Sequence, residues 1–245
     1  MTSISAGRWI VMGNFRWARS IFSDNWCSRG RPWLKWGPIS TPIRWSWRSW
    51  WGHRPGGYAF EPQRLVFQTL CANMALNSQA HVHCIQAAVG QAPGQVLVPV
   101  LDSEAANNFG GLAAAGHESG EEVPLVTLDG MALSQCALCK IDVEGMELQV
   151  LQGEVETIER CRPILYVEND RPEHSPALIG WLQERDYLLY WHCPPLSNAA
   201  NYYANRKNEF GRTVSVNMLC LHQSVKTNIT GLRQVEGPDS DWRAQ

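Results

Sequence analysis

Several features that would place this chain in a special class are absent from its sequence. It contains no stretch of about 18 or more uncharged apolar residues, so we expect no transmembrane helix. Near the amino terminus Arg16 and Arg19 interrupt any apolar segment of the kind that a secretory signal requires. The eight cysteines are scattered and lack the dense spacing of a small disulfide-stapled module. We therefore expect a cytoplasmic protein whose thiols are reduced and mostly buried.

The sequence also lacks the second pair of ligands that a structural zinc site needs. Cys136 and Cys139 have CxxC spacing, and His81, His83 and Cys84 are conceivable partners. Structural zinc requires a second matched pair of ligands, and this CxxC runs directly into an apolar segment typical of a strand. We therefore expect no metal site.

The chain divides into two parts of unlike composition. With 245 residues, 44% of them hydrophobic, it is long enough for one full-sized α/β domain. Residues 1–57 hold nine basic residues and one acid, which leaves a net charge of -10 for the rest, and they hold nine of the twelve tryptophans. They show neither strand nor helix periodicity, and we expect them to be irregular. Residues 58–223 should form the folded domain, and residues 224–245 a polar tail.

Strand and helix patterns alternate from residue 58 onward. Alternation of this kind is typical of a mostly parallel sheet with helices on both faces. Such sheets bind ligands at the carboxyl ends of their strands. Residues 91–122 are rich in loop signals. The pattern predicts strands at 58–60, 81–89, 123–128, 138–142, 164–168, 187–191 and 214–221, and helices at 62–77, from about 146 to 162, and from Pro176.

Two of these strand ends carry acids suited to a site. Glu61 follows the strand at 58–60, where a carboxylate can accept the two hydroxyls of a ribose. Asp142, Glu144 and Glu147 surround Gly145 in a strand-to-helix turn. A structural turn needs only the glycine and one cap, so the additional acids favour a function there.

Several segments of the sequence resemble the FkbM-type methyltransferases, among them the strands predicted at 164–168 and 214–221. The similarity extends from about residue 58 to residue 222, and its most specific part is Lys140-Ile-Asp-Val-Glu-Gly-Met-Glu-Leu148. The other segments are Phe60-Glu-Pro62, Ala87-Ala-Val-Gly90 and Val126-Thr-Leu-Asp129. The resemblance implies a Rossmann-like class I fold that uses S-adenosylmethionine (SAM).

The resemblance also implies roles for single residues. Glu61 would hold the SAM ribose, Gln86 and Ala87 would line the adenine, and Asp142 would lie near the sulfonium. Asp142 and Glu144 are then the candidate catalytic residues for methyl transfer to a hydroxyl of a sugar, lipid or secondary metabolite. The sequence carries no signal for the identity of this acceptor or for the oligomeric state.

One part of the family pattern is missing, namely the glycine-rich turn after the first strand that lets the backbone approach the cofactor. Residues 1–57 do not supply it in the frame as written. When the last base of each codon is read with the first two bases of the next, the codons for residues 34–39 can encode Glu-Val-Gly-Ala-Asn, which is the missing motif. We therefore predict that residues 14–56 are an out-of-frame translation, that this chain binds SAM weakly or not at all, and that its methyl transfer is impaired.

Two other functions are consistent with the same sequence. The domain could be a catalytically inactive fold that acts as a binding module. The basic, tryptophan-rich arm of residues 1–57 could bind nucleic acid, although no RNA-binding motif accompanies it. Of the possible partners, we favour a small-molecule or glycan acceptor and consider nucleic acid the less favoured one.

Overall fold

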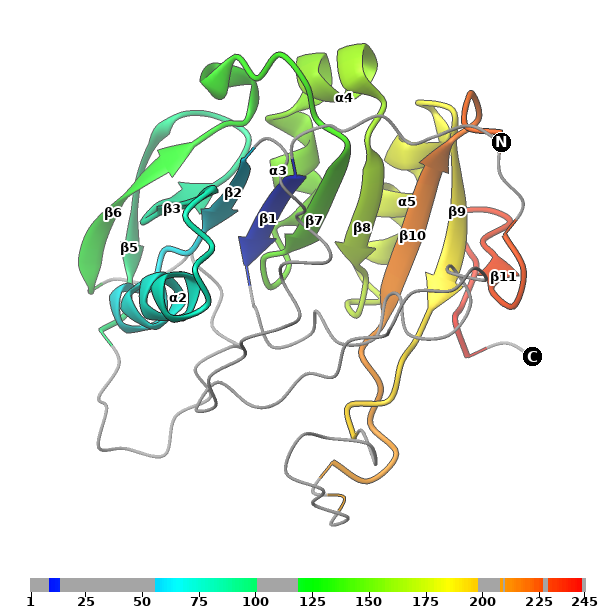
Figure 1. Ribbon diagram of the computed structural model, residues 1–245. Coiled ribbons are helices and arrows are strands. Elements are labelled where there is room, and N and C mark those ends of the chain that lie inside the picture. The colour runs from blue at the N-terminus through cyan, green and yellow to red at the C-terminus, as the bar shows by residue number, and fades with distance from the viewer. Residues whose placement is uncertain are drawn as a thin grey trace.

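The computed structural model describes residues 56–100, 119–197, 210–226 and 229–243, together with residue 208 and the backbone of residues 9–13. These residues form a mixed α/β structure with one large and one small sheet (Figure 1). Most of the arm of residues 1–57, and residues 101–118 of the loop-rich segment, lie outside the described residues.

The large sheet has eight strands in the order β11-β9-β10-β8-β7-β1-β2-β3 (Figure 1). The run from β8 to β3 is parallel, whereas β10, β9 and β11 are antiparallel to their neighbours. The strands are β1 Trp9–Gly13, β2 Gly57–Phe60, β3 Val82–Ile85, β7 Leu138–Asp142, β8 Ile164–Glu168, β9 Tyr187–His192, β10 Asn217–His222 and β11 Arg233–Gln234.

The expectation that all of residues 1–57 are irregular is wrong at β1. This strand lies in the middle of the sheet, parallel to β7 on one side and to β2 on the other. A central parallel strand is buried on both faces, so its sequence is a continuous apolar run in which apolar and polar residues do not alternate. The sequence of Trp9–Gly13 is such a run. A search for period 2 therefore misses it. The predicted out-of-frame segment falls almost wholly on residues outside the described part of the chain and stays a prediction.

The two faces of the large sheet differ in character. On β7 and β8, the side chains of Cys139, Ile141, Leu165 and Val167 join the main hydrophobic core. This core includes residues of α3 (Glu147–Gln152), α4 (Val155–Cys161) and α5 (Ser175–Gln183), which lie behind the sheet in Figure 1.

The opposite face carries the intervening side chains, and those toward the carboxyl ends of these strands are mostly polar. They are Lys140 and Asp142 on β7 and Tyr166 and Glu168 on β8. Further along this face, α2 (Arg64–Leu76) packs Leu70 and Met74 against Ala59 of β2. Helices therefore cover both faces, as the alternating pattern predicts.

The predicted strand at 81–89 is two strands in different sheets. It divides at Gln86 and Ala87 into β3 and β4 (Ala88–Val89). β4 belongs to a three-stranded sheet of order β4-β6-β5 with β5 (Gly94–Val98) and β6 (Glu121–Val126). The loop assignment for 91–122 is thus wrong at β5, whose antiparallel pairing with β6 is a long-range contact that the local pattern does not show.

The predicted helix from 146 to 162 is two short helices, α3 and α4, that part at Gly153. A Cβ atom at this glycine would lie 2.1 Å from the carbonyl oxygen of Gly90, so the backbone of the neighbouring loop passes against it. Asp129, which begins a 3₁₀ turn (Asp129–Met131), then accepts hydrogen bonds from the N–H groups of Glu156 and Thr157 and caps α4.

The remaining sequence predictions have clear outcomes. The segments at 58–60, 138–142, 164–168 and 187–191 are strands, and Pro176 lies in the first turn of α5, as predicted. The expected polar tail is partly built into the fold, because β11 pairs with β9 and Val235 is buried. All cysteines in the described part are free thiols, three of them buried and four half-buried.

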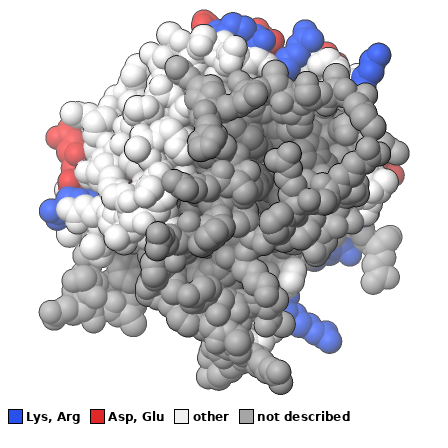
Figure 2. Space-filling view, in the orientation of Figure 1, with Lys and Arg blue, Asp and Glu red and all other residues white. Residues whose placement is uncertain are grey.

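Two observations concern the surface of the described residues. Searching them finds no helix that is both long and apolar enough to cross a membrane. In the view of Figure 2, their Lys, Arg, Asp and Glu side chains lie along the outline of the molecule.

Candidate functional site

The site residues predicted from the sequence meet at one edge of the large sheet. Gly13 at the end of β1 is in register with Asp142, and Phe60 at the end of β2 is in register with Ile85. Because these strands are parallel, their carboxyl ends lie at the same edge. Asp142, Glu61 and Gln86 therefore line one edge on both sides of β1, as the sequence predicted.

Glu61 is a buried carboxyl at the end of β2. Its Oε1 accepts a hydrogen bond of 2.8 Å from the N–H of Gln63, and Gln63 in turn caps α2. Burial raises the pKa of Glu61 to about 7, the bond from Gln63 opposes this, and the charge of Asp142 adds to it. Glu61 and Asp142 are thus electrostatically coupled across β1.

Gln86 and Ala87 are placed differently from each other. The Gln86 side chain is half-buried, and its Nε2 donates to Glu121 at 3.4 Å. The Ala87 side chain lies in the main core, and its N–H donates to the carbonyl oxygen of Ile85. Gln86 can therefore offer a side chain to a ligand, whereas the side chain of Ala87 is taken up by the core.

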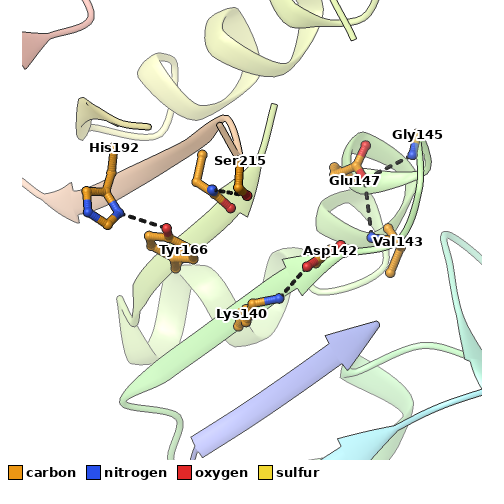
Figure 3. A network of polar contacts seen from close by, with 9 residues as sticks. Lys140, Asp142, Val143, Gly145, Glu147, Tyr166, His192 and Ser215 are labelled. Carbon is orange, nitrogen blue, oxygen red and sulfur yellow. Dashed lines mark hydrogen bonds and ion pairs between the residues drawn. The ribbon is translucent and has the colours of Figure 1, made fainter. Parts of the chain in front are cut away.

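Asp142 ends β7 and is held by an ion pair. Its Oδ2 lies 2.5 Å from the Nζ of Lys140 on the same face of the strand (Figure 3). The other oxygen, Oδ1, is buried and has no hydrogen-bond partner among the described residues. A buried carboxylate oxygen without a donor is costly, so this atom requires a proton or a ligand beside it.

The two glutamates that follow Asp142, Glu144 and Glu147, have different roles in the turn after β7. Glu147 accepts hydrogen bonds from the N–H groups of Val143, at 3.2 Å, and Gly145, at 3.0 Å, and so closes the turn (Figure 3). It is the structural cap that such a turn requires. Glu144 and Gly145 both have positive φ, at 56° and 97°, a conformation that costs a non-glycine residue about 1 kcal/mol or more.

This strained turn directs Glu144 toward Arg171. The Arg171 guanidinium is 3.2 Å from the Glu144 carboxylate, and its side chain passes over Gly145, where a Cβ would meet Nε at 2.9 Å. Burial raises the pKa of Glu144 to about 7, and Asp142 and Asp170 add to this, while Arg171 opposes it. Glu144 is half-buried and lies beside Asp142.

Sequence reasoning missed Glu168, which belongs to the same group of acids. It ends β8, and since Ile141 pairs with Val167, the next residues Asp142 and Glu168 lie side by side. The pKa of Glu168 is raised to about 10, mainly by burial and also by the charge of Asp142 and a hydrogen bond with its carboxyl, while Lys140 opposes the increase. The available signal was that both strands end in an acid after an apolar run, as the printed sequence shows.

The comparisons with known proteins bear on what this edge does. A family model described as the methyltransferase FkbM domain matches residues 37–189, which is more than half of the chain. This chain belongs to the FkbM methyltransferase family. The resemblance inferred from the sequence is therefore confirmed, although the match begins before residue 58 and ends before residue 222.

One solved structure is similar to this FkbM family member. It is the crystal structure of methyltransferase FkbM from Methylobacillus flagellatus KT, with 15% sequence identity and a TM-score of 0.47. The similarity covers 71% of this chain and 39% of that chain, so the FkbM member studied here spans much less than the length of that protein. A search of curated proteins found no match.

Proposed function

We propose that this chain is a SAM-dependent methyltransferase of the Rossmann-like class I type that methylates a hydroxyl of a small-molecule or glycan acceptor. Family membership and the carboxyl edge of the large sheet support the proposal. Open parallel sheets bind their ligands outside the carboxyl ends of the strands, and Glu61, Gln86 and Asp142 gather at that edge. The observation that carries the assignment is the position of Glu61 and Asp142 on the two strands beside β1.

The residues present fit the nucleoside part of SAM. Glu61 would accept hydrogen bonds from the ribose hydroxyls at the end of β2, and Gln86 at the end of the adjacent β3 would line the adenine, with the carbonyl of Ala87 beside it. The sulfonium end would then lie toward Asp142, whose Oδ1 has no partner in the described part of the chain. SAM would supply the methyl group.

The chain's own part in the reaction is to hold the acceptor and take its proton. Asp142 and Glu144 would accept hydrogen bonds from the acceptor hydroxyl, and one of these carboxylates would receive its proton as the methyl group is transferred. Lys140 and Arg171 fix these two carboxylates through their ion pairs. In-line transfer depends mainly on such positioning.

β1 changes the expectation for cofactor binding. With Trp9–Gly13 in the sheet, the first strand is present, and Gly13 lies in register with Asp142 where the cofactor must approach the backbone. The residues that follow Gly13 are Asn-Phe-Arg-Trp, which contain no second glycine. We therefore expect this chain to bind SAM, with lower affinity than a protein that has the complete glycine-rich turn.

A methyl-transfer assay tests the proposed chemistry. The chain is incubated with methyl-labelled SAM and a panel of sugar, lipid and small-metabolite hydroxyl acceptors. We expect labelled product with at least one acceptor class, and a loss of about 10²–10⁴-fold in kcat for Asp142→Asn, which keeps the shape but removes the basicity. Glu173→Gln, an exposed acid, is the control. Equal turnover by Asp142→Asn and the unaltered chain would show that Asp142 is structural.

A further inference from the structure

Three carboxyl groups at the edge of the sheet form a compact set of oxygen ligands. Each of Asp142, Glu144 and Glu168 offers one carboxylate oxygen, and these atoms lie within 4.8 Å of one another. Ligands on opposite sides of Ca²⁺, at about 2.4 Å each, are about 4.8 Å apart, and around Mg²⁺ they are about 4.2 Å apart. The spacing therefore suits a cation of this class.

A second observation points to a ligand at this place. Oδ1 of Asp142 and Oε2 of Glu168 are buried and accept no hydrogen bond from an N–H or O–H donor among the described residues, and the two carboxyl groups lie close enough to share a proton. Their residues are only 2% and 8% exposed. Two buried carboxyls in contact on adjacent strand ends are destabilising unless a proton or a cation lies between them, and a cation can take the place of the proton.

Five carboxyls gather at this place, because Glu61 and Asp170 interact with the same group, and Lys140 and Arg171 are the positive charges beside them. Lys140 pairs with Oδ2 of Asp142 and Arg171 pairs with Glu144, and neither donates a hydrogen bond to Oδ1 of Asp142 or Oε2 of Glu168. The raised pKa values of Glu61, Glu144 and Glu168 mean that these groups hold protons, in part or fully, near neutral pH, and a bound cation would displace them.

We propose that Asp142, Glu144 and Glu168 bind one divalent cation that prefers oxygen ligands, such as Mg²⁺, Mn²⁺ or Ca²⁺. The absence of thiol and imidazole groups from the set disfavours zinc. This differs from the sequence-based expectation of no metal site, which considered only Cys and His clusters. The inference rests on the proposed function for its role: a cation here would bind the acceptor hydroxyl and make its proton easier to remove.

Binding of Mn²⁺ alone tests the site. The chain is titrated with MnCl₂ in the absence of SAM and acceptor, and free Mn²⁺ is followed by electron paramagnetic resonance. We expect one saturable site per chain with a Kd of about 10⁻⁴–10⁻³ M, displaced by Mg²⁺ or Ca²⁺. Glu168→Gln and Glu144→Gln should each weaken binding by about tenfold or more, since each removes one of three charged ligands.

The matched control is Glu122→Gln, the same change at an exposed position on β6, and it should leave Mn²⁺ binding unaltered. Far-ultraviolet circular dichroism checks that each variant is folded. If Glu168→Gln does not fold, Glu144→Gln decides, because Glu144 is only half-buried. No saturable Mn²⁺ binding by the unaltered chain, or unchanged binding in the folded variants, would overturn the inference. Either result would leave SAM binding, measured separately, as the test of the proposed function.

Discussion

At the scale of single residues, buried acids outnumber the groups that neutralise them. Glu154 is the clearest case outside the site, since it is fully buried between α3 and α4. Burial raises its pKa to about 8, a hydrogen bond with the Cys139 thiol opposes this, and Asp129 adds to it. Cys136 and Tyr187 also face it, and both are neutral hydroxyl or thiol groups with raised pKa values. Glu154 is thus held in its neutral form.

This placement predicts a pH dependence of stability. The folded state retains the Glu154 proton up to about pH 8, whereas the unfolded chain loses it near the ordinary pKa of 4.5. The free energy of unfolding should therefore fall as pH rises through this window, by at most about 1.4 kcal/mol per pH unit for one group. Glu154→Gln should remove part of this slope, measured by urea unfolding at several pH values.

Glu159→Gln, on the exposed side of α4, is the control and should leave the slope unchanged. Glu61 and Glu144, each with a pKa of about 7, contribute slope in the same direction and remain in both variants. An identical slope in Glu154→Gln and the unaltered chain would contradict the neutral assignment of Glu154.

At the scale of elements, the close approach at Gly153 sets where α3 ends. Gly153 has an ordinary negative φ of -88°, so a side chain is excluded by contact and not by backbone strain. Gly153→Ala would place a Cβ 2.1 Å from the Gly90 carbonyl oxygen, and the loop would have to move. We expect a loss of about 1–3 kcal/mol in the free energy of unfolding, measured by chemical denaturation.

Gly94→Ala provides the matched comparison, because a Cβ there meets nothing within 4 Å. It should leave stability unchanged or raise it by about 0.4–1 kcal/mol, through a less flexible unfolded chain. Equal effects of the two substitutions would contradict the packing described around Gly153.

The elements also show which features the sequence could predict. Residues 138–142 and 164–168 are recognisable because each is a buried strand with a terminal acid, and Asp142 and Glu61 follow from that pattern. The division at Gly153 and the strand at 94–98 depend on contacts with distant residues, Gly90 and β6. β1 was missed because a strand between two parallel neighbours has no alternation to detect, and Glu168 because its importance comes from lying beside Asp142.

At the scale of the whole molecule, the account depends on β1. It joins β7 to β2 and so brings Asp142, which ends β7, to the same edge as Glu61, which follows β2. The family match begins at residue 37, inside the segment that we predict to be out of frame. Sequencing the locus tests that prediction, because stop codons in the second frame over residues 14–56 would exclude it.

A calorimetric titration with SAM tests the central claim most directly, namely that the edge beside β1 holds the cofactor through Glu61. We predict saturable binding by the unaltered chain and a loss of about 1.5–3 kcal/mol in Glu61→Ala, which is about 10- to 150-fold in Kd. Glu122→Gln should bind as the unaltered chain does, and circular dichroism shows that both variants are folded. No SAM binding by the unaltered chain, or equal binding by a folded Glu61→Ala variant, would contradict the account.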